Sequence, residues 1–258
     1  MKEFERLIGI MEKLRGPGGC PWDAAQTLES IMKCLIEEAF ELRDAVLEKN
    51  LPAIREELGD VLLQVVFCGL IARDKGYFDL EDVIEYLCDK LVYRHPHVFG
   101  DTVVKDAEEV LKNWEKLKEQ EEGKAGRESI FSGLPKSLPA LLYALKIQSL
   151  AARVGFDWPD AKGVLSKIAE ETRELSAAVE SGIKDDIEAE IGDLLFTVVN
   201  LCRHIKIDPE TALQRANMKF TGRFREIEKK ARAAGISLSD MENAEMERIW
   251  EAAKDFSG

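Results

Sequence analysis

Two groups of carboxylates occur along the chain at a constant separation. The first group is Glu37, Glu38, Glu41, Glu57 and Asp60, and the second is Glu170, Glu171, Glu174, Glu190 and Asp193. Each carboxylate of the first group is separated from its counterpart in the second group by the same number of residues, as Glu38 is from Glu171. On a helix, side chains three positions apart share a face, so Glu38 with Glu41 and Glu57 with Asp60 each form an acidic edge. The sequence therefore predicts a site of four facing carboxylates that is present twice.

The chemistry of such a site follows from its surroundings and its donor atoms. Five apolar residues at helical spacing lie beside each second acidic pair: Ile54, Leu58, Val61, Leu62 and Val65 in the first copy, and Ile187, Ile191, Leu194, Leu195 and Val198 in the second. Carboxylates beside an apolar core repel one another and resist desolvation unless a cation neutralises them. Oxygen donors without His or Cys favour Mg²⁺, or Mn²⁺, over zinc or copper.

A di-iron centre is the main alternative for four carboxylates in a helical bundle. Such centres use Glu-x-x-His pairs. None of the three histidines follows a glutamate by three positions. The sequence therefore disfavours di-iron chemistry.

A glycine stands between the two acids of each second pair, at Gly59 and Gly192. Within a helix, glycine costs about 1 kcal/mol relative to alanine. Because both copies accept this cost at the same place, we expect another helix or a ligand to approach closely there.

Basic residues follow each acidic pattern. Lys90 with Arg94, and Lys219 with Arg223, are each four positions apart and share a helix face. Such pairs could bind polyphosphate beside a metal that polarises phosphorus. Basic residues near helix ends also complement the helix dipole, so both interpretations stay open. The sequence contains no Walker loop, GxGxxG or GxSxG motif.

Composition narrows the class of protein. The 258 residues carry a formal net charge of −13, which disfavours nucleic acid and anionic membranes as partners. The longest apolar run is far shorter than the ~20 residues that span a bilayer, and residues 1–15 have the pattern of an amphipathic helix. The five cysteines form no CxxC pair, so we expect reduced thiols in a soluble, cytoplasmic protein.

Helical periodicity covers most of the chain, and strand-like alternation is nearly absent. Helix starts are indicated by Thr27, by Asp79 with Asp82, by Asp208 before Pro209, and by Ser239 with Glu242. The segment 20–23 is expected to be a loop. The fold class is therefore all-α, with two tandem antiparallel helical bundles at 1–118 and 138–258, joined by a charged linker at 119–137.

These residues resemble a known family. The patterns EExxE at 37–41 with ExxD at 57–60, and their second copies at 170–174 and 190–193, are similar to the signature of MazG nucleoside triphosphate pyrophosphohydrolases. Further similar stretches are GCPWD at 19–23, YRHPHVF at 93–99, GFDW at 155–158 and KFxxRF at 219–224. The resemblance covers nearly the whole chain and is to the tandem-domain form.

The resemblance implies a homodimer that cleaves (d)NTPs between the α- and β-phosphates, with Mg²⁺, to a nucleoside monophosphate and pyrophosphate. The implied metal ligands are Glu38, Glu41, Glu57 and Asp60 in the first copy, and Glu171, Glu174, Glu190 and Asp193 in the second. Glu37 and Glu170 would orient or deprotonate the attacking water. The expected role is removal of non-canonical nucleotides or control of nucleotide pools.

Other residues allow two interpretations each. Trp22 and Trp158 could stack on a base, but tryptophan in a helical protein is more often part of the core, which is the interpretation we favour. His95 and His97 flank a proline, so a structural turn is as good an interpretation as a ligand role. Asn217 has no asparagine counterpart in the first copy, so the two sites could differ in specificity.

Two other functions remain as alternatives to the hydrolase. One is a regulatory module that binds nucleotides without cleaving them, and the other is a helical interaction scaffold with a structural metal. Release of pyrophosphate separates the hydrolase from both.

Overall fold

The computed structural model describes residues 2–120 and 129–254, and these form two compact units, one within 1–125 and one within 126–258. Each unit is considered by itself. Every regular element in the described ranges is a helix, which confirms the all-α prediction. None of the described helices is long and apolar enough to cross a membrane. The linker expected at 119–137 falls partly on residues 121–128, which lie outside the described ranges.

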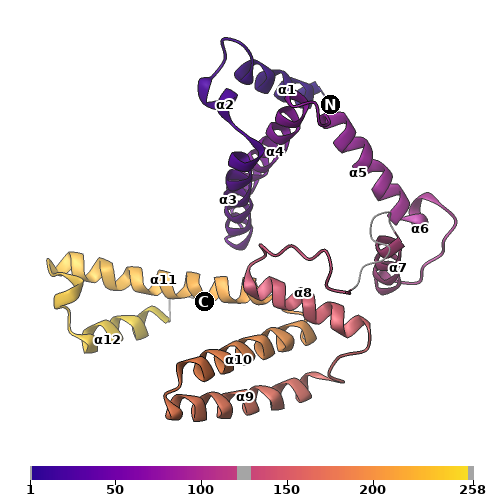
Figure 1. Ribbon diagram of the computed structural model, residues 1–258. Coiled ribbons are helices and arrows are strands. Elements are labelled where there is room, and N and C mark those ends of the chain that lie inside the picture. Colours follow the sequence, from indigo (N-terminus) through magenta and orange to yellow (C-terminus); the bar gives the residue numbers. More distant parts are fainter. Residues whose placement is uncertain (1, 121–128, 255–258) are drawn as a thin grey trace. The chain divides into compact units, whose positions relative to one another are not determined.

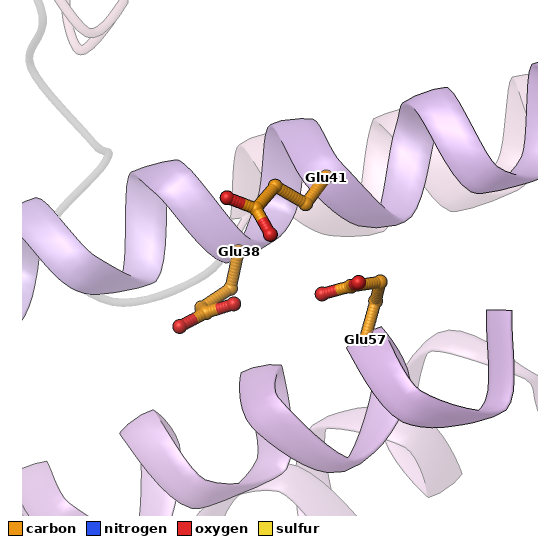
Figure 2. Close-up of side chains that lie close together, drawn as sticks. All are labelled: Glu38, Glu41 and Glu57. Carbon is orange, nitrogen blue, oxygen red and sulfur yellow. The ribbon is translucent and has the colours of Figure 1, made fainter. Parts of the chain in front are cut away.

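The first unit contains seven helices in its described part. They are α1 (Lys2–Arg15), α2 (Pro21–Ala25), α3 (Leu28–Leu47), α4 (Leu51–Asp74), α5 (Leu80–Arg94), α6 (Pro96–Phe99) and α7 (Ala107–Gln120). Helices α3 and α4 form an antiparallel hairpin and pack along each other, as Figures 1 and 2 show. Helix α5 diverges from this hairpin (Figure 1).

The second unit repeats the hairpin. Its elements are α8 (Ala140–Arg153), α9 (Ala161–Ser181), α10 (Lys184–His204), α11 (Pro209–Ala234), the short 3₁₀ helix η1 (Leu238–Asp240) and α12 (Asn243–Lys254). Helix α10 packs along α9 and also against α8 (Figure 1).

Capping residues start both hairpins at equivalent positions. The Thr27 side chain accepts from the Ser30 backbone N–H, and the Ser30 hydroxyl accepts from the Thr27 N–H, which makes a capping box. Asp160, the counterpart of Thr27 in the second copy, accepts from the N–H groups of Lys162 and Gly163 at 2.9 and 3.1 Å. Each cap fixes the start of the helix that carries the first acidic pair.

Three predicted helix starts are confirmed and two local expectations are wrong. Besides the cap at Thr27, Asp79 with Asp82 forms a capping box on α5, and Asp208 caps α11. The segment expected as a loop at 20–23 instead begins the short helix α2, because proline at a first helical position is already set for helix. Ser239 does not cap the last helix: it lies within η1, and the carbonyl of Glu242 accepts the first bond of α12.

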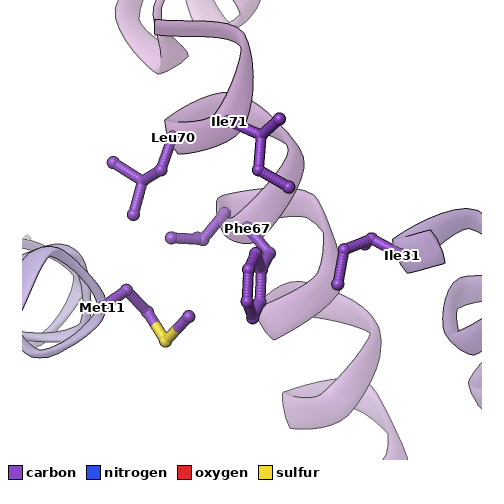
Figure 3. Close-up of a cluster of buried hydrophobic side chains, with 6 residues drawn as sticks. Met11, Ile31, Phe67, Leu70 and Ile71 are labelled. Atoms are coloured by element: carbon purple, nitrogen blue, oxygen red, sulfur yellow. The ribbon is translucent and has the colours of Figure 1, made fainter. Parts of the chain in front are cut away.

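The core of the first unit joins α1, α3 and α4. Met11 from α1 and Ile31 from α3 pack against Phe67, Leu70 and Ile71 of α4 (Figure 3). The inter-helix contact recurs in the second unit, since buried Ile31 and Val66 have buried counterparts in the second copy at Val164 and Val199. The same packing therefore sets the distance between the two acidic helices in both units.

The apolar residues beside the acidic pairs do not belong to this core. Leu58 is 53% exposed and Leu62 is 42% exposed, and Ile191 and Leu195 are exposed at 45% and 53%. The interpretation that these arcs face a core within the unit is wrong for the single chain. The residues that pack in the core lie on the adjoining face of the same helix.

We predict that Asp160→Ala lowers the free energy of unfolding by about 1 kcal/mol, because two backbone N–H groups at the start of α9 lose their acceptor. Urea denaturation followed by circular dichroism measures this. Glu180→Ala, which removes an exposed carboxylate at the other end of the same helix, serves as the control and should cause no comparable loss.

Candidate functional site

The hairpin of the first unit brings three glutamates together. Glu38 and Glu41 of α3 point toward Glu57 of α4 across the helix contact (Figure 2). One carboxylate oxygen from each lies within 4.8 Å of the other two. The structure thus forms a three-carboxylate cluster from residues of two helices that are separated along the sequence.

The electrostatics of this cluster favour a cation. Loss of hydration raises the pKa of Glu38 above its usual value, and the charges of Asp60 and Glu41 raise it further. The pKa of Glu57 is raised by the same loss of hydration, and then by Glu41 and Asp60. Asp60 is not one of the three clustered residues, but its charge acts on both glutamates.

The second unit builds the equivalent cluster from α9 and α10. Carboxylate oxygens of Glu171, Glu174 and Glu190 lie within 4.8 Å of one another. Desolvation raises the pKa of Glu190, and the charges of Glu174, Glu171 and Asp193 add to the effect. Asp193 is exposed, one turn beyond Glu190 on α10.

Lys167 distinguishes the second cluster from the first. Its Nζ lies 2.7 Å from Glu171 Oε1 and 2.8 Å from Glu170 Oε1. Glu171 has only 5% of its side chain exposed, and the ammonium holds the pKa of Glu170 below its usual value. The equivalent position in the first unit is Cys34, so there the chain does not place a cation at this point.

Lys167 was not among the residues predicted from the sequence. Comparison of the two copies position by position would have revealed it, because a lysine precedes the second EExxE pattern by three residues where the first copy has Cys34.

The donor set fits a hard divalent cation. Each cluster offers several carboxylate oxygens at close range and contains neither a histidine nor a cysteine among its described members. Mg²⁺ in proteins is held by one or more carboxylates and keeps positions open for water and substrate phosphates. Loss of hydration, and then the charges of neighbouring acids, raise the pKa values of Glu38, Glu57 and Glu190, so a cation would stabilise their charged forms.

The two helix glycines face open space. A Cβ built on Gly59 or on Gly192 meets no atom of the described chain within 4 Å, other than the helix's own backbone. The expectation that another helix approaches closely is therefore wrong within each unit. A ligand or a second copy remains as an explanation.

The predicted phosphate-binding residues lie on helices other than the acidic ones. Lys90 and Arg94 are toward the end of α5, where Lys90 lies over the Tyr86 ring and Arg94 over the Trp114 ring. In the second unit Arg223 lies over the Trp250 ring at 5.7 Å. Lys219 and Asn217 are on the same helix, α11. Their role as phosphate ligands stays a prediction.

The tryptophans are not core residues. Trp22 on α2 is 60% exposed, and Trp158 is 42% exposed before the start of α9. The interpretation that they fill the core is therefore wrong, and both are accessible to a ligand. His95 follows the last residue of α5, and its Nδ1 lies 2.6 Å from the carbonyl oxygen of Leu91, a contact consistent with a structural turn, while a ligand role stays open.

Comparison with known protein families shows which domain the repeated hairpin belongs to. A family model described as the MazG nucleotide pyrophosphohydrolase domain matches residues 26–99 and 160–227. The chain belongs to the MazG family. Each match contains one complete acidic hairpin, so the repeat in the structure is a repeat of the MazG domain.

Two curated relatives match nearly the whole chain, and one solved structure matches part of it. The nucleoside triphosphate pyrophosphohydrolase/pyrophosphatase MazG of Thermotoga maritima is 47% identical over 251 residues, which cover 97% of this chain and 95% of that protein. The nucleoside triphosphate pyrophosphohydrolase of Escherichia coli K12 is 42% identical over 257 residues, 98% of both chains. A crystal structure of a mazG-related protein from Thermotoga maritima aligns with 45% of this chain and 99% of its own at 31% identity, with a TM-score of 0.40.

We predict that Lys167→Met destabilises the metal-free protein by about 2 kcal/mol, because the nearly buried Glu171 loses its charged partner. Added Mn²⁺ should restore more stability to this variant than to the unsubstituted protein, because the cation then supplies the missing countercharge. Thermal unfolding with and without Mn²⁺ measures both effects.

The matched control is Lys162→Met on the exposed first turn of α9. Equal metal-induced shifts in the two variants would show that Lys167 does not share the site with the cation.

Proposed function

We propose that this chain hydrolyses nucleoside triphosphates at the bond between the α- and β-phosphates, releasing a nucleoside monophosphate and pyrophosphate. The observation that carries the proposal is the duplicated glutamate cluster at the helix contact of each MazG domain. Relatives that match over almost their full length carry the name nucleoside triphosphate pyrophosphohydrolase.

We assign the cation to the acidic clusters. Glu38, Glu41, Glu57 and Asp60 would hold it in the first unit, and Glu171, Glu174, Glu190 and Asp193 in the second. Mg²⁺, or Mn²⁺, would neutralise these acids and polarise the substrate phosphate. The raised pKa values of Glu38, Glu57 and Glu190 support this assignment.

The remaining polar residues have roles around the phosphates. Glu37 and Glu170 lie beside the ligand glutamates, and we assign them to orient or deprotonate the attacking water. Lys167 lowers the pKa of Glu170 and so makes it a weaker base, which favours orienting the water over deprotonating it in the second unit. The pairs Lys90 with Arg94 and Lys219 with Arg223 would contact the polyphosphate.

We also propose that the working protein is a homodimer. The exposed apolar residues on the acidic hairpins, among them Leu58 and Leu62, form a helix face of the kind that oligomers bury. The open space beside Gly59 and Gly192 is compatible with such a contact. The proposed role is to remove non-canonical nucleotides or to limit nucleotide pools.

We predict that the double substitution Glu41→Gln with Glu174→Gln lowers pyrophosphate release by at least about a hundredfold without unfolding the chain. Loss of groups that only support metal ligands already costs about 10–100-fold, so loss of a ligand in each cluster should cost more. A coupled pyrophosphate assay with Mg²⁺ over a panel of NTPs and dNTPs measures the rate.

The matched control is Glu48→Gln with Glu180→Gln, which changes one exposed glutamate at or near the end of each first acidic helix. Unchanged turnover in the Glu41 and Glu174 double variant would refute the assignment. Nucleotide binding without pyrophosphate from the unsubstituted protein would favour a regulatory binding module instead.

A further inference from the structure

The last helix of each unit packs against the helix that carries the basic pair. Helix α7 contacts α5 in the first unit, and α12 folds back along α11 in the second (Figure 1). In the first unit Arg94 Cζ lies 5.1 Å from the ring centroid of Trp114. In the second unit Arg223 Cζ lies 5.7 Å from the ring centroid of Trp250. A contact between an arginine of the basic pair and a tryptophan of the last helix is therefore present in both units.

The two contacts are not related by the constant separation that relates the acidic residues. The arginines are closer together along the chain than two equivalent acids are, and the tryptophans are further apart. Both arginines nevertheless lie the same number of residues after the first residue of their helix, Leu80 in α5 and Pro209 in α11. The chain between arginine and tryptophan is longer in the second unit. The packing of the last helix thus brings the two side chains together across connections of different length.

Arg223 carries a positive charge that no described carboxylate neutralises. Its Nε is buried and has no hydrogen-bond partner in the described part of the chain. Glu226, about one turn further along α11, pairs instead with Lys229, whose Nζ lies 2.6 Å from Glu226 Oε1. A partly buried guanidinium without an acceptor is costly, and an anionic ligand would supply the acceptor.

A tryptophan ring is suited to hold such a guanidinium without neutralising it. The ring contacts the cation through its electron-rich face, and the planar N–H edges of the guanidinium stay available for a phosphate. A carboxylate in the same place would occupy those N–H groups and compete with the phosphate. The ring also restricts the rotamers of a long side chain, so less conformational entropy is lost when the ligand binds.

We propose that Trp114 and Trp250 are positioning residues, each of which holds the arginine of its own unit, Arg94 or Arg223, in the orientation that binds a phosphate group of the substrate. The tryptophans act through the arginines and not through the base. The inference rests on the proposed function, because it takes the two arginines as phosphate ligands.

The test measures the binding of inorganic pyrophosphate with Mg²⁺ by calorimetric titration of the full-length chain. Pyrophosphate has no base, so a tryptophan that only stacks on a base would not affect its binding. The chain also carries Arg94→Leu, so that the binding measured is that of the second unit. Trp250→Leu should then weaken binding by about fivefold, because Arg223 is no longer held in place. Trp250→Phe, which keeps an aromatic face, should restore most of the affinity.

The equivalent measurement for the first unit uses Trp114→Leu in a chain that carries Arg223→Leu. It should give a loss of similar size. Circular dichroism melts establish that each variant is folded.

A double-mutant cycle shows whether Trp250 acts through Arg223. In a chain with Arg223→Leu, the further change Trp250→Leu should cause no additional loss of affinity, since no guanidinium is left to orient. Additive losses would show that Trp250 contributes independently of Arg223 and would overturn the proposal. Unchanged pyrophosphate affinity in folded Trp250→Leu would overturn it as well.

Met246→Ala is the control for packing. Met246 packs in the same cluster between α11 and α12, beside Ile227, but has no aromatic ring. This variant should lower the melting temperature and leave the affinity for pyrophosphate unchanged. Equal weakening by Met246→Ala and Trp250→Leu would show that the packing of α12 alone is responsible, contrary to the proposal.

The positioning role and the proposed function fail in different ways. Release of pyrophosphate from nucleoside triphosphates, with unchanged pyrophosphate affinity in all tryptophan variants, would reject the positioning role and leave the function standing. No release from any nucleotide, with the loss in Trp250→Leu and its dependence on Arg223 both observed, would reject the function and support the positioning role.

Discussion

Mutual repulsion among closely spaced carboxylates is the constraint on which both units depend. Three glutamate oxygens within 4.8 Å, partly stripped of water, oppose folding unless something else holds the helices together. The packing of α3 on α4, and of α9 on α10, does this, with Ile31 and Val66 buried in the first unit and Val164 and Val199 buried in the second. The hydrophobic contact thus stabilises an arrangement of charge that would otherwise separate, and a bound cation would relieve the repulsion.

The two copies handle this constraint in different ways. In the second unit Lys167 lies against Glu170 and Glu171, so the chain itself supplies part of the countercharge. In the first unit Cys34 occupies that position, and the pKa of Glu38 is raised instead. A duplicated site can therefore keep its cluster of carboxylates while the balance of charge around the cluster differs between the two copies.

The sequence predicted the helices and the acidic pairs well because both depend on local spacing. The helical period, the caps at Thr27, Asp79 and Asp208, and the constant separation of the two acidic groups are visible without tertiary structure. Which apolar residues are buried was harder to predict from the sequence, because a helix such as α4 has two adjoining apolar faces. The sequence could not say that Phe67 would be buried and Leu58 exposed, since this depends on where α1 packs.

The exposed apolar faces and the helix glycines both bear on whether two copies of the chain associate. Leu58 and Leu62 flank Gly59 and Asp60 on α4, and Ile191 and Leu195 flank Gly192 and Asp193 on α10. A glycine costs helix stability in both copies, yet no described part of the same chain approaches either one. An exposed apolar face of this kind is best explained by a covering surface, and a face repeated in both units is suited to a symmetric contact between identical chains. In the proposed homodimer the acidic clusters would lie at the edge of the contact between the chains, where the partner would complete the enclosure of the phosphates.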